Sequence, residues 1–302
     1  MRPANNIFEL IGKTPIVKLS WLSQETKADV FAKLEFFNPF FSIKDRVAWA
    51  MIEEAEKKGL IKKNTIIIEA TSGNTGIALA GVCRAKGYKV IIVMPDNVPQ
   101  ERIKLLNILG VQVMLTPAKR GMEAAIKKVK LLTEKLSNTF VPDQFKNLAN
   151  PRIHEYTTAR EIQQTMKRVD VVICGIGTAG TITGIAKFFK KRRKKTKIVG
   201  VEPQKSAVLS GGGAGKHKIF GIGAGFIPPL LERELIDEIV TISDKEAMKM
   251  SQEIACREAI LCGISSGAVA CAALKIAQKR KVRGKRLLLI FADSLERYLS
   301  FL

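Results

Sequence analysis

Histidine is scarce in this 302-residue chain, and its cysteines are not paired in sequence. There are two histidines, His154 and His217, and five cysteines, of which no two form a C-x-x-C pair. The sequence therefore offers no ligand set for a structural zinc site or a haem-attachment site, and we expect no metal. Unpaired cysteines in apolar surroundings are typical of a reducing compartment.

Long apolar runs are missing as well. The first fifteen residues, MRPANNIFELIGKTP, lack the apolar stretch of a signal peptide, and no other segment is long and uncharged enough to cross a bilayer. We therefore expect a soluble, cytoplasmic protein.

Acidic residues are few compared with basic ones. The chain has 50 Lys and Arg against 28 Asp and Glu, which gives a formal net charge of +22. Such a charge attracts anions in general, including nucleic acids and acidic membrane surfaces. The densest run, KFFKKRRKKTK at 187–197, comes at the end of an expected helix, where cations suit the helix dipole. No aromatic-rich strand motif or finger spacing accompanies it, so we interpret it as a solvated helix end and expect no nucleic-acid partner.

Short apolar strands alternate with amphipathic helices along most of the chain. This pattern predicts an α/β fold with largely parallel sheets and helices on both faces, in two three-layer halves. The stretch 204–230 is rich in Gly and Pro and predicts a long functional loop. The expected strands are 29–35, 65–70, 88–94, 111–115, 169–177, 197–203 and 286–292, and the expected helices are 43–59, a small-residue helix after 76, 99–110, 121–136, one from about 180, 244–261 and 265–280.

Two Gly-containing turns follow apolar strands and open helices. In GIGTAGTITG, at 175–184, backbone N–H groups and threonine hydroxyls form an anion cradle at a helix N-terminus. It lacks a P-loop lysine and the acidic residue of a dinucleotide site, so a small phosphate-bearing cofactor suits it better. TSGNTG, at 71–76, offers donors to a carboxylate, or alternatively only caps the next helix. The hundred residues between the turns suggest two halves that face one cleft.

One lysine has unusual neighbours. In FFNPFFSIKDR, at 36–46, Lys44 follows four phenylalanines and enters the first turn of an expected helix, with Ser42 and Asp45 spaced as a capping box. The helix dipole and the apolar neighbours both lower the pKa of an amine and raise its nucleophilic fraction. Lys44 is therefore a candidate reactive amine.

The chain resembles a known family from end to end. The resemblance lies in the series NPFFSIKDR, EATSGNTGIALA, MPDN…QER, DQFKN…NP, GIGTAGT, GIGAGFIP, CGISSGAVA and DSLERYLS, in this order. Together these segments are similar to those of cysteine synthase, or O-acetylserine sulfhydrylase, in the β-family (fold type II) of pyridoxal-phosphate enzymes. The motifs leave open whether the A-type or the B-type isozyme is the better match.

The resemblance implies roles for individual residues. Lys44 would form the internal Schiff base with pyridoxal 5′-phosphate and would later move the α-proton. Asn74 would bond the pyridoxal 3′ oxygen. Ser265, in place of a carboxylate, would meet the pyridine nitrogen, which favours β-elimination over transamination. The implied phosphate-binding residues are Gly177, Thr178, Ala179, Gly180 and Thr181, and the implied substrate-binding residues are Thr71, Ser72, Thr75, Gln144 and Gly221.

The resemblance also implies a reaction and an architecture. O-acetylserine would lose acetate, and a sulfur donor would add to give L-cysteine. Residues 1–36 and 143–302 would form the larger, phosphate-binding domain, and 37–142 a smaller, mobile domain that closes on the substrate. A homodimer is implied, as is binding of the C-terminal tail of serine acetyltransferase. The alternatives are an impaired homologue that only binds this tail, and a related enzyme of the cystathionine β-synthase type or one that uses O-phosphoserine.

Several positions depart from the family pattern. Phe40 and Phe41 stand where a small residue and a glycine are usual, and Ala179 stands where glycine is frequent. If the backbone at residue 41 needs a positive φ, phenylalanine there costs about 1–2 kcal/mol. The other expected Gly or Pro positions that are altered, by residues that do not favour turns, are Leu148, Ala159, Arg160, Lys216, Ala292 and Leu295.

Overall fold

The computed structural model of the chain describes residues 3–192, 195–279 and 282–301. The chain divides into two compact units, a small one formed by the segment up to Ile11 with Lys44–Ala149, and a large one formed by Gly12–Ile43 with the chain from Asn150 onward. These limits lie seven residues beyond the expected ones at 36 and 142. The N-terminal turn belongs to the small unit, where the Lys86 ammonium lies 5.3 Å from the Phe8 ring centroid.

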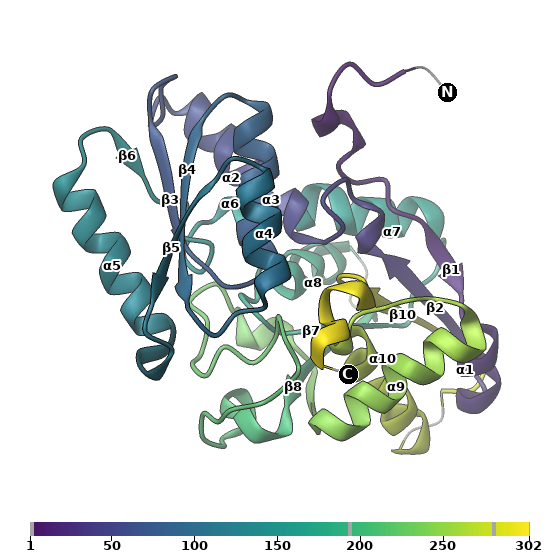
Figure 1. Cartoon of the computed structure of the whole chain (residues 1–302). Helices are drawn as coiled ribbons and strands as arrows, with labels where there is room; N and C mark the ends of the chain where they lie inside the picture. Colours follow the sequence, from purple (N-terminus) through teal and green to yellow (C-terminus); the bar gives the residue numbers. More distant parts are fainter. Residues whose placement is uncertain (1–2, 193–194, 280–281, 302) are drawn as a thin grey trace. The chain divides into compact units, whose positions relative to one another are not determined.

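The small unit contains a parallel sheet of four strands in the order β5-β4-β3-β6. Helix α5 covers one face, and α3 and α4 lie on the other, with α2 packed on α3 (Figure 1). Ile68, Ile91 and Val93 pack beneath α5. The elements are α2 (Lys44–Lys57), β3 (Ile66–Ala70), α3 (Asn74–Ala85), β4 (Lys89–Pro95), α4 (Gln100–Ile108), β5 (Gln112–Thr116), α5 (Gly121–Lys135) and β6 (Thr139–Phe140), preceded by a 3-10 turn at Ile7–Leu10.

The large unit contains a six-stranded sheet in the order β1-β2-β10-β7-β8-β9. All neighbouring strands are parallel except β1, which pairs antiparallel with β2. The strands are β1 (Ile16–Lys18), β2 (Asp29–Leu34), β7 (Val171–Gly175), β8 (Lys197–Pro203), β9 (Glu238–Ile242) and β10 (Arg286–Phe291). The helices are α1 (Ser20–Thr26), α6 (Ala149–Ile153), a π-helical turn (His154–Thr158), α7 (Ala159–Thr165), α8 (Gly180–Arg192), α9 (Asp244–Glu258) and α10 (Ile264–Lys279).

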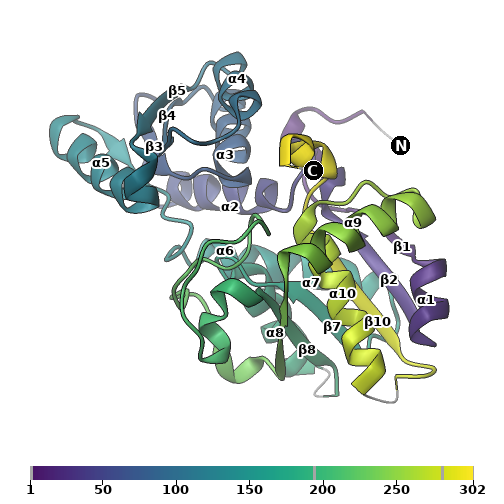
Figure 2. The ribbon, with the colours of Figure 1, turned by 60° about the horizontal axis from the view of Figure 1, so that its bottom comes forward.

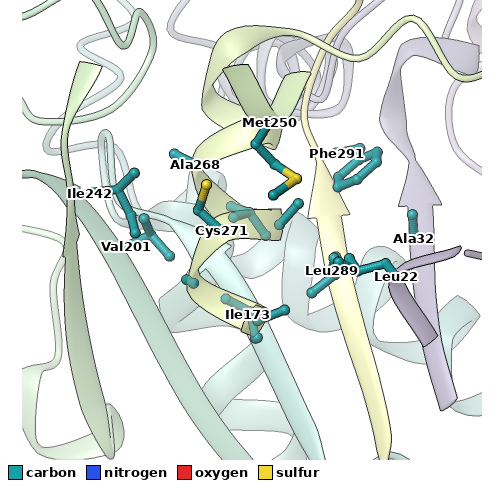
Figure 3. Close-up of a cluster of buried hydrophobic side chains, with 14 of the residues drawn as sticks. Leu22, Ala32, Ile173, Val201, Ile242, Met250, Ala268, Cys271, Leu289 and Phe291 are labelled. Atoms are coloured by element: carbon teal, nitrogen blue, oxygen red, sulfur yellow. The ribbon is translucent and has the colours of Figure 1, made fainter. Parts of the chain in front are cut away.

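Apolar side chains fill both faces of this large sheet. On one face, α9 and α10 pack on each other and on the strands (Figure 2). Ile173, Leu289, Met250 and Cys271 meet there in one buried cluster (Figure 3). On the other face, α7 and α8 pack over alternate residues of the same strands, such as Val172. Helices therefore cover both faces of a mostly parallel sheet, which confirms the expected α/β class.

Two of the positions where Gly or Pro was expected lie in α7. Ala159 is buried with φ −69° and ψ −35°, and it begins α7, which also contains Arg160. Alanine and arginine favour a helix over glycine and proline, so the interpretation of lost turn residues is wrong at this point. None of the altered positions 148, 159, 160, 216, 292 and 295 has a positive φ.

No helix in the described ranges is both long and apolar enough to span a membrane.

Candidate active site

Both Gly-containing turns lie where parallel strands end. The turn at 71–76 follows β3, and the turn at 175–181 follows β7. Ligands of open α/β sheets bind at this carboxyl edge, outside the ends of the strands. Each unit therefore presents one candidate binding turn.

The turn of the small unit is organised by its strand and by α4. Thr71 is buried, its N–H donates to the Val93 carbonyl at 3.0 Å, and its hydroxyl accepts from Gly73 N–H at 3.3 Å. The Arg102 guanidinium donates to the Ser72 carbonyl. Helix α3 then begins at Asn74, and its N-cap, Gly73, makes no side-chain cap. The threonine and serine hydroxyls of this turn thus do not serve as the N-cap that the alternative interpretation supposed.

Gln144 reaches this turn from the segment after β6. Its Oε1 accepts a hydrogen bond from the Thr75 hydroxyl at 2.5 Å, and both side chains are buried. Two residues that the resemblance assigns to the substrate carboxylate therefore contact each other in the small unit, and their role toward a substrate stays a prediction.

Glu69 holds Gln144 in this position, and the sequence analysis gave it no role. Its carboxyl group accepts hydrogen bonds from Asp143 N–H at 3.0 Å and from Gln144 N–H at 3.3 Å. Burial raises the pKa of Glu69 to about 7, although these two bonds favour the charged form. The available signal was a charged residue inside the apolar strand TIIIEA.

Lys44 is the first residue of α2 and is half-buried. The helix begins one residue later than expected, which keeps Lys44 in its first turn. Its neighbours Ile43 and Val47 are buried. The lowered pKa of this amine and the capping box of Ser42 and Asp45 stay predictions.

The segment that leads to Lys44 contains the expected backbone strain. Phe41 has a φ of 61°, and its side chain is 61% exposed. Its N–H donates to the Asn38 carbonyl at 2.9 Å, and the Arg297 guanidinium donates to the Phe40 carbonyl. Ile43 N–H donates to the Ala292 carbonyl at 2.9 Å. These bonds hold the segment in place despite a conformation that costs phenylalanine about 1–2 kcal/mol.

The turn of the large unit is an anion cradle. Ala179 has a φ of 66°, and α8 begins at the next residue, so successive N–H groups point out of the helix end. Thr178 and Thr181 add hydroxyl groups, and the first turn of α8 contains no acidic residue. The positive end of a 13-residue helix without a nearby carboxylate suits a phosphate dianion.

Two residues that the sequence analysis did not assign support this cradle. The Asn150 amide donates to the Thr178 hydroxyl at 3.0 Å, and a Cβ at Gly180 would lie 1.9 Å from Asn150 Oδ1. His154 is fully buried, with Nε2 at 3.2 Å from the Thr181 hydroxyl and Nδ1 at 2.9 Å from the Thr158 hydroxyl. The spacing of His154 and Thr158 was visible in the sequence, but the contact of His154 with Thr181 on α8 was not.

The loop around Gly221 packs directly on the cradle. Gly221 has a φ of 87°, and a Cβ at Gly177 would lie 2.3 Å from its carbonyl oxygen. Gly223 N–H donates to the Ile176 carbonyl at 2.9 Å. The structure thus brings together two segments of the large unit that are about forty residues apart in sequence.

Ser265 lies at the same edge of the large sheet. It is buried and is the second residue of α10, so it is not the N-cap of this helix. Gly263 N–H donates to the Asp293 carbonyl at 2.9 Å, which fixes the start of α10 beside the end of β10. The first turn of α10 contains no acidic residue, so Ser265 could offer a hydroxyl group, and not a carboxylate, to a ring nitrogen. This donor set fits a phosphate-bearing pyridine that is not held by a carboxylate.

Comparisons with known proteins agree with this donor set. Residues 7–293 match the family described as "Pyridoxal-phosphate dependent enzyme". A cysteine synthase of Staphylococcus aureus is 48% identical over 301 residues, which cover 99% of this chain and 96% of that protein.

Two solved structures extend the comparison to the fold. A cysteine synthase of Entamoeba histolytica is 42% identical, with a TM-score of 0.95 over 99% of this chain and 90% of that one. A hydrogen sulfide-producing enzyme of Fusobacterium nucleatum is 44% identical, with a TM-score of 0.94 over 98% of this chain and 100% of that one.

Proposed function

Because the chain belongs to the family of pyridoxal-phosphate dependent enzymes, we propose that it is a cysteine synthase, which joins a sulfur donor such as sulfide to O-acetylserine and releases L-cysteine and acetate. The observation that carries the proposal is the 48% identity to a cysteine synthase over 99% of the chain. The residues assigned below lie within this similar region.

We propose an individual role for each residue that would hold the cofactor. Lys44 would be joined to its aldehyde carbon, Asn74 would bond its 3′ oxygen and Ser265 its ring nitrogen. The phosphate would be held by the cradle, which comprises Gly177, Thr178, Ala179, Gly180 and Thr181. Pyridoxal phosphate supplies, when bound, an electron-withdrawing ring that stabilises negative charge at the α-carbon of an amino acid. What supports these roles is the N-terminal end of α8 and the buried hydroxyl at the start of α10.

The turn of the small unit would hold the substrate carboxylate. Thr71, Ser72 and Thr75 would donate from their hydroxyl or N–H groups at the N-terminal end of α3, where a negative charge is favoured. Gln144 would donate through its amide NH₂, because its Oε1 already accepts from Thr75. Such fixed donors orient the α-hydrogen of the substrate toward the base.

Lys44 would act as the base. Once the amino group of the substrate has replaced the Lys44 amine at the aldehyde carbon, the freed amine would accept the α-proton. The β-carbon–oxygen bond would break with release of acetate, and sulfide would add at the β-carbon. The proton would then return from Lys44 to the α-carbon. Gly221 would line the substrate side of the phosphate cradle, since its carbonyl lies against Gly177.

The remaining expectations concern the whole protein. We propose that the unit with Lys44 is the smaller, mobile domain and that it closes on the substrate to exclude water. We also propose a cytoplasmic homodimer that binds the C-terminal tail of serine acetyltransferase. Analytical ultracentrifugation with and without a synthetic tail peptide tests the last two points.

The spectrum of the cofactor tests the reaction. Purified protein loaded with pyridoxal phosphate is titrated with O-acetylserine and, separately, with O-phosphoserine, and sulfide is then added. A shift of the visible band with O-acetylserine, its reversal by sulfide and the formation of cysteine are expected. An unchanged spectrum with the cofactor demonstrably bound would contradict the proposal and favour a binding protein without turnover. A shift with O-phosphoserine alone would change the leaving group to phosphate.

A further inference from the structure

The amino-terminal ends of the parallel strands of the large unit form one continuous edge. Four backbone hydrogen bonds of 2.9 Å join the starts of β2, β10, β7, β8 and β9, in this order across the sheet. They run from Asp29 N–H to Lys285 O, from Asp170 N–H to Arg286 O, from Lys197 N–H to Asp170 O and from Asp237 N–H to Ile198 O. We call this row the amino edge and define it by Lys18 at the end of β1 with residues 27–29, 167–170, 195–197, 237–238 and 283–286.

The amino edge is strongly basic. It contains nine Lys or Arg residues and four Asp or Glu residues. The end of α8 adds Lys190, Lys191 and Arg192 beside it. Part of the basic run 187–197 thus lies beside other basic segments that are distant in sequence, and residues 193 and 194 lie outside the described residues. A solvated helix end alone, as first interpreted for 187–197, would not be surrounded by basic residues from other segments.

Three of the four acidic residues of the amino edge, Asp29, Asp170 and Asp237, accept hydrogen bonds inside the unit. Asp29 accepts from Lys18 at 2.7 Å, and this bond lowers the pKa of Asp29. Asp170 accepts from Arg168 at 3.0 Å and from Arg286 N–H at 2.8 Å. These carboxylates tie strand starts together.

Asp237 also accepts hydrogen bonds inside the unit. Several cations of the amino edge, by contrast, have no acidic partner among the described residues. Asp237 accepts from Lys190 and from Ile198 N–H, both at 2.7 Å. Among the described residues, Lys27, Lys195, Lys197 and Arg283 form no ion pair, and all four are exposed. The positive charge of the amino edge is therefore directed to solvent.

The amino edge contributes no large apolar side chain that is exposed. It thus has no aromatic platform for unstacked bases, as single-strand binders have, and no apolar anchor for a lipid bilayer. At one end, a shallow hollow is lined by Lys18, Lys27 and Arg283 together with Asp29, which pairs with Lys18, so two of its three cations have no acidic partner among the described residues. This composition suits recognition of phosphate groups alone.

Contrary to the expectation from the basic run 187–197 alone, we infer that the amino edge binds the phosphate backbone of double-stranded nucleic acid, independently of sequence. Strands lie ~4.8 Å apart, so the four steps from β2 to β9 span ~19 Å. A duplex presents one negative charge per ~1.7 Å of its axis, so a row of this length faces several phosphates. The cradle of α8 lies at the opposite, carboxyl edge of the same sheet, which leaves the reaction site open while the duplex is bound.

The test compares two triple variants that lose the same charge. K195Q/K197Q/R283Q removes three unpaired cations of the amino edge, and K127Q/K128Q/K130Q removes three exposed cations from α5 of the small unit. Full-length enzyme loaded with cofactor is titrated into a labelled duplex of about 20 base pairs at about 50 to 200 mM salt. Fluorescence anisotropy gives the Kd and its salt dependence.

The wild-type enzyme is expected to bind at physiological salt. The amino-edge variant is expected to bind about tenfold or more weakly, with a salt slope smaller by about 2–3, because ~0.9 counterion is released per phosphate contact. The α5 variant is expected to stay within about twofold of wild type, and both variants are expected to retain cysteine synthesis. Equal loss in both variants, no retention of duplex at physiological salt, or binding to phosphatidylserine vesicles without binding to duplex would each overturn the inference.

Discussion

Phe41 holds a backbone conformation that glycine adopts freely. Its φ of 61° lies in the left-handed region, and its ring is 61% exposed, so burial of the ring compensates little of the cost. We expect Phe41→Gly to stabilise the folded protein by ~0.5–1 kcal/mol, which is the ~1–2 kcal/mol of strain less the larger entropy that glycine loses on folding. Urea unfolding with cofactor-free protein measures this change.

Phe37 provides the matched control. It lies in the same segment with 60% exposure, but its φ is not positive. Phe37→Gly is therefore expected to destabilise the protein slightly or to leave it unchanged. Equal effects of the two substitutions would show that the loss of an exposed ring, and not the backbone at residue 41, decides the stability.

Glu69 is expected to make stability depend on pH. Burial raises its pKa from 4.5 to about 7 in the folded protein, so folding takes up a proton between these two pH values. Its contribution to stability is complete below about pH 4.5 and falls as the pH rises toward 7. The side chain of Glu69→Gln cannot titrate, so this variant serves as the reference. As the pH rises across this window, the free energy of unfolding of wild type minus that of the variant is expected to fall by on the order of 3 kcal/mol.

Urea unfolding at several pH values, from about 4.5 to about 7.5, measures this difference. Parallel stability curves for the two proteins would contradict the account of Glu69 as a buried group with a raised pKa.

We expect cofactor binding to depend most on the N-terminus of α8. A Cβ at Gly180 would lie 1.9 Å from Asn150 Oδ1, so Gly180→Ala must displace either the helix end or the segment before α7. Loss of a single hydrogen bond to a charged phosphate costs about 1.5–3 kcal/mol, so we expect the Kd for pyridoxal phosphate to rise about tenfold or more. Absorbance of the bound cofactor after dialysis against graded concentrations measures the Kd.

Gly213→Ala provides the matched control for Gly180→Ala. A Cβ there meets no atom within 4 Å, and its φ is not positive. Gly213→Ala is expected to leave the Kd unchanged. An unchanged Kd for Gly180→Ala as well would show that the phosphate is not held at the start of α8.

Sequence patterns predicted most of the longer strands but missed β1, β6 and the five-residue strand β9, Glu238–Ile242. Strand β8 spans Lys197–Pro203, as expected from its apolar run. Strands β1 and β6 have three and two residues, too few for a periodicity to appear. The π-helical turn His154–Thr158 was also missed, because it depends on close packing against α8, where Gly184 leaves no room for a side chain.

For the candidate site, too, sequence patterns indicated only part of the residues. Glycine, threonine and lysine in fixed motifs indicated the phosphate cradle and Lys44 from the sequence. The supporting groups Asn150, His154 and Glu69 act through contacts with residues distant in sequence, and only tertiary structure reveals such contacts. The strain at Phe41 was predicted conditionally, because its φ is set by the bonds that hold the segment 38–43.

At the scale of the whole molecule, each of the two units contains one Gly-containing turn at the carboxyl edge of its own parallel sheet. The account assigns the cofactor aldehyde to Lys44 of the small unit and the cofactor phosphate to the cradle of the large unit. A chain with 34 lysines offers many competing amines, so the assignment of the cofactor to one lysine is a demanding claim.

Reduction of the holoenzyme with borohydride, followed by peptide mass spectrometry, tests this claim most directly. Reduction fixes the cofactor to whichever amine carries it, and the labelled peptide identifies the residue. We expect one phosphopyridoxyl group per chain, on Lys44, and no label at any site in Lys44→Ala protein. A label on another lysine of the wild-type enzyme, or no label at Lys44 while the visible band is present, would contradict the account.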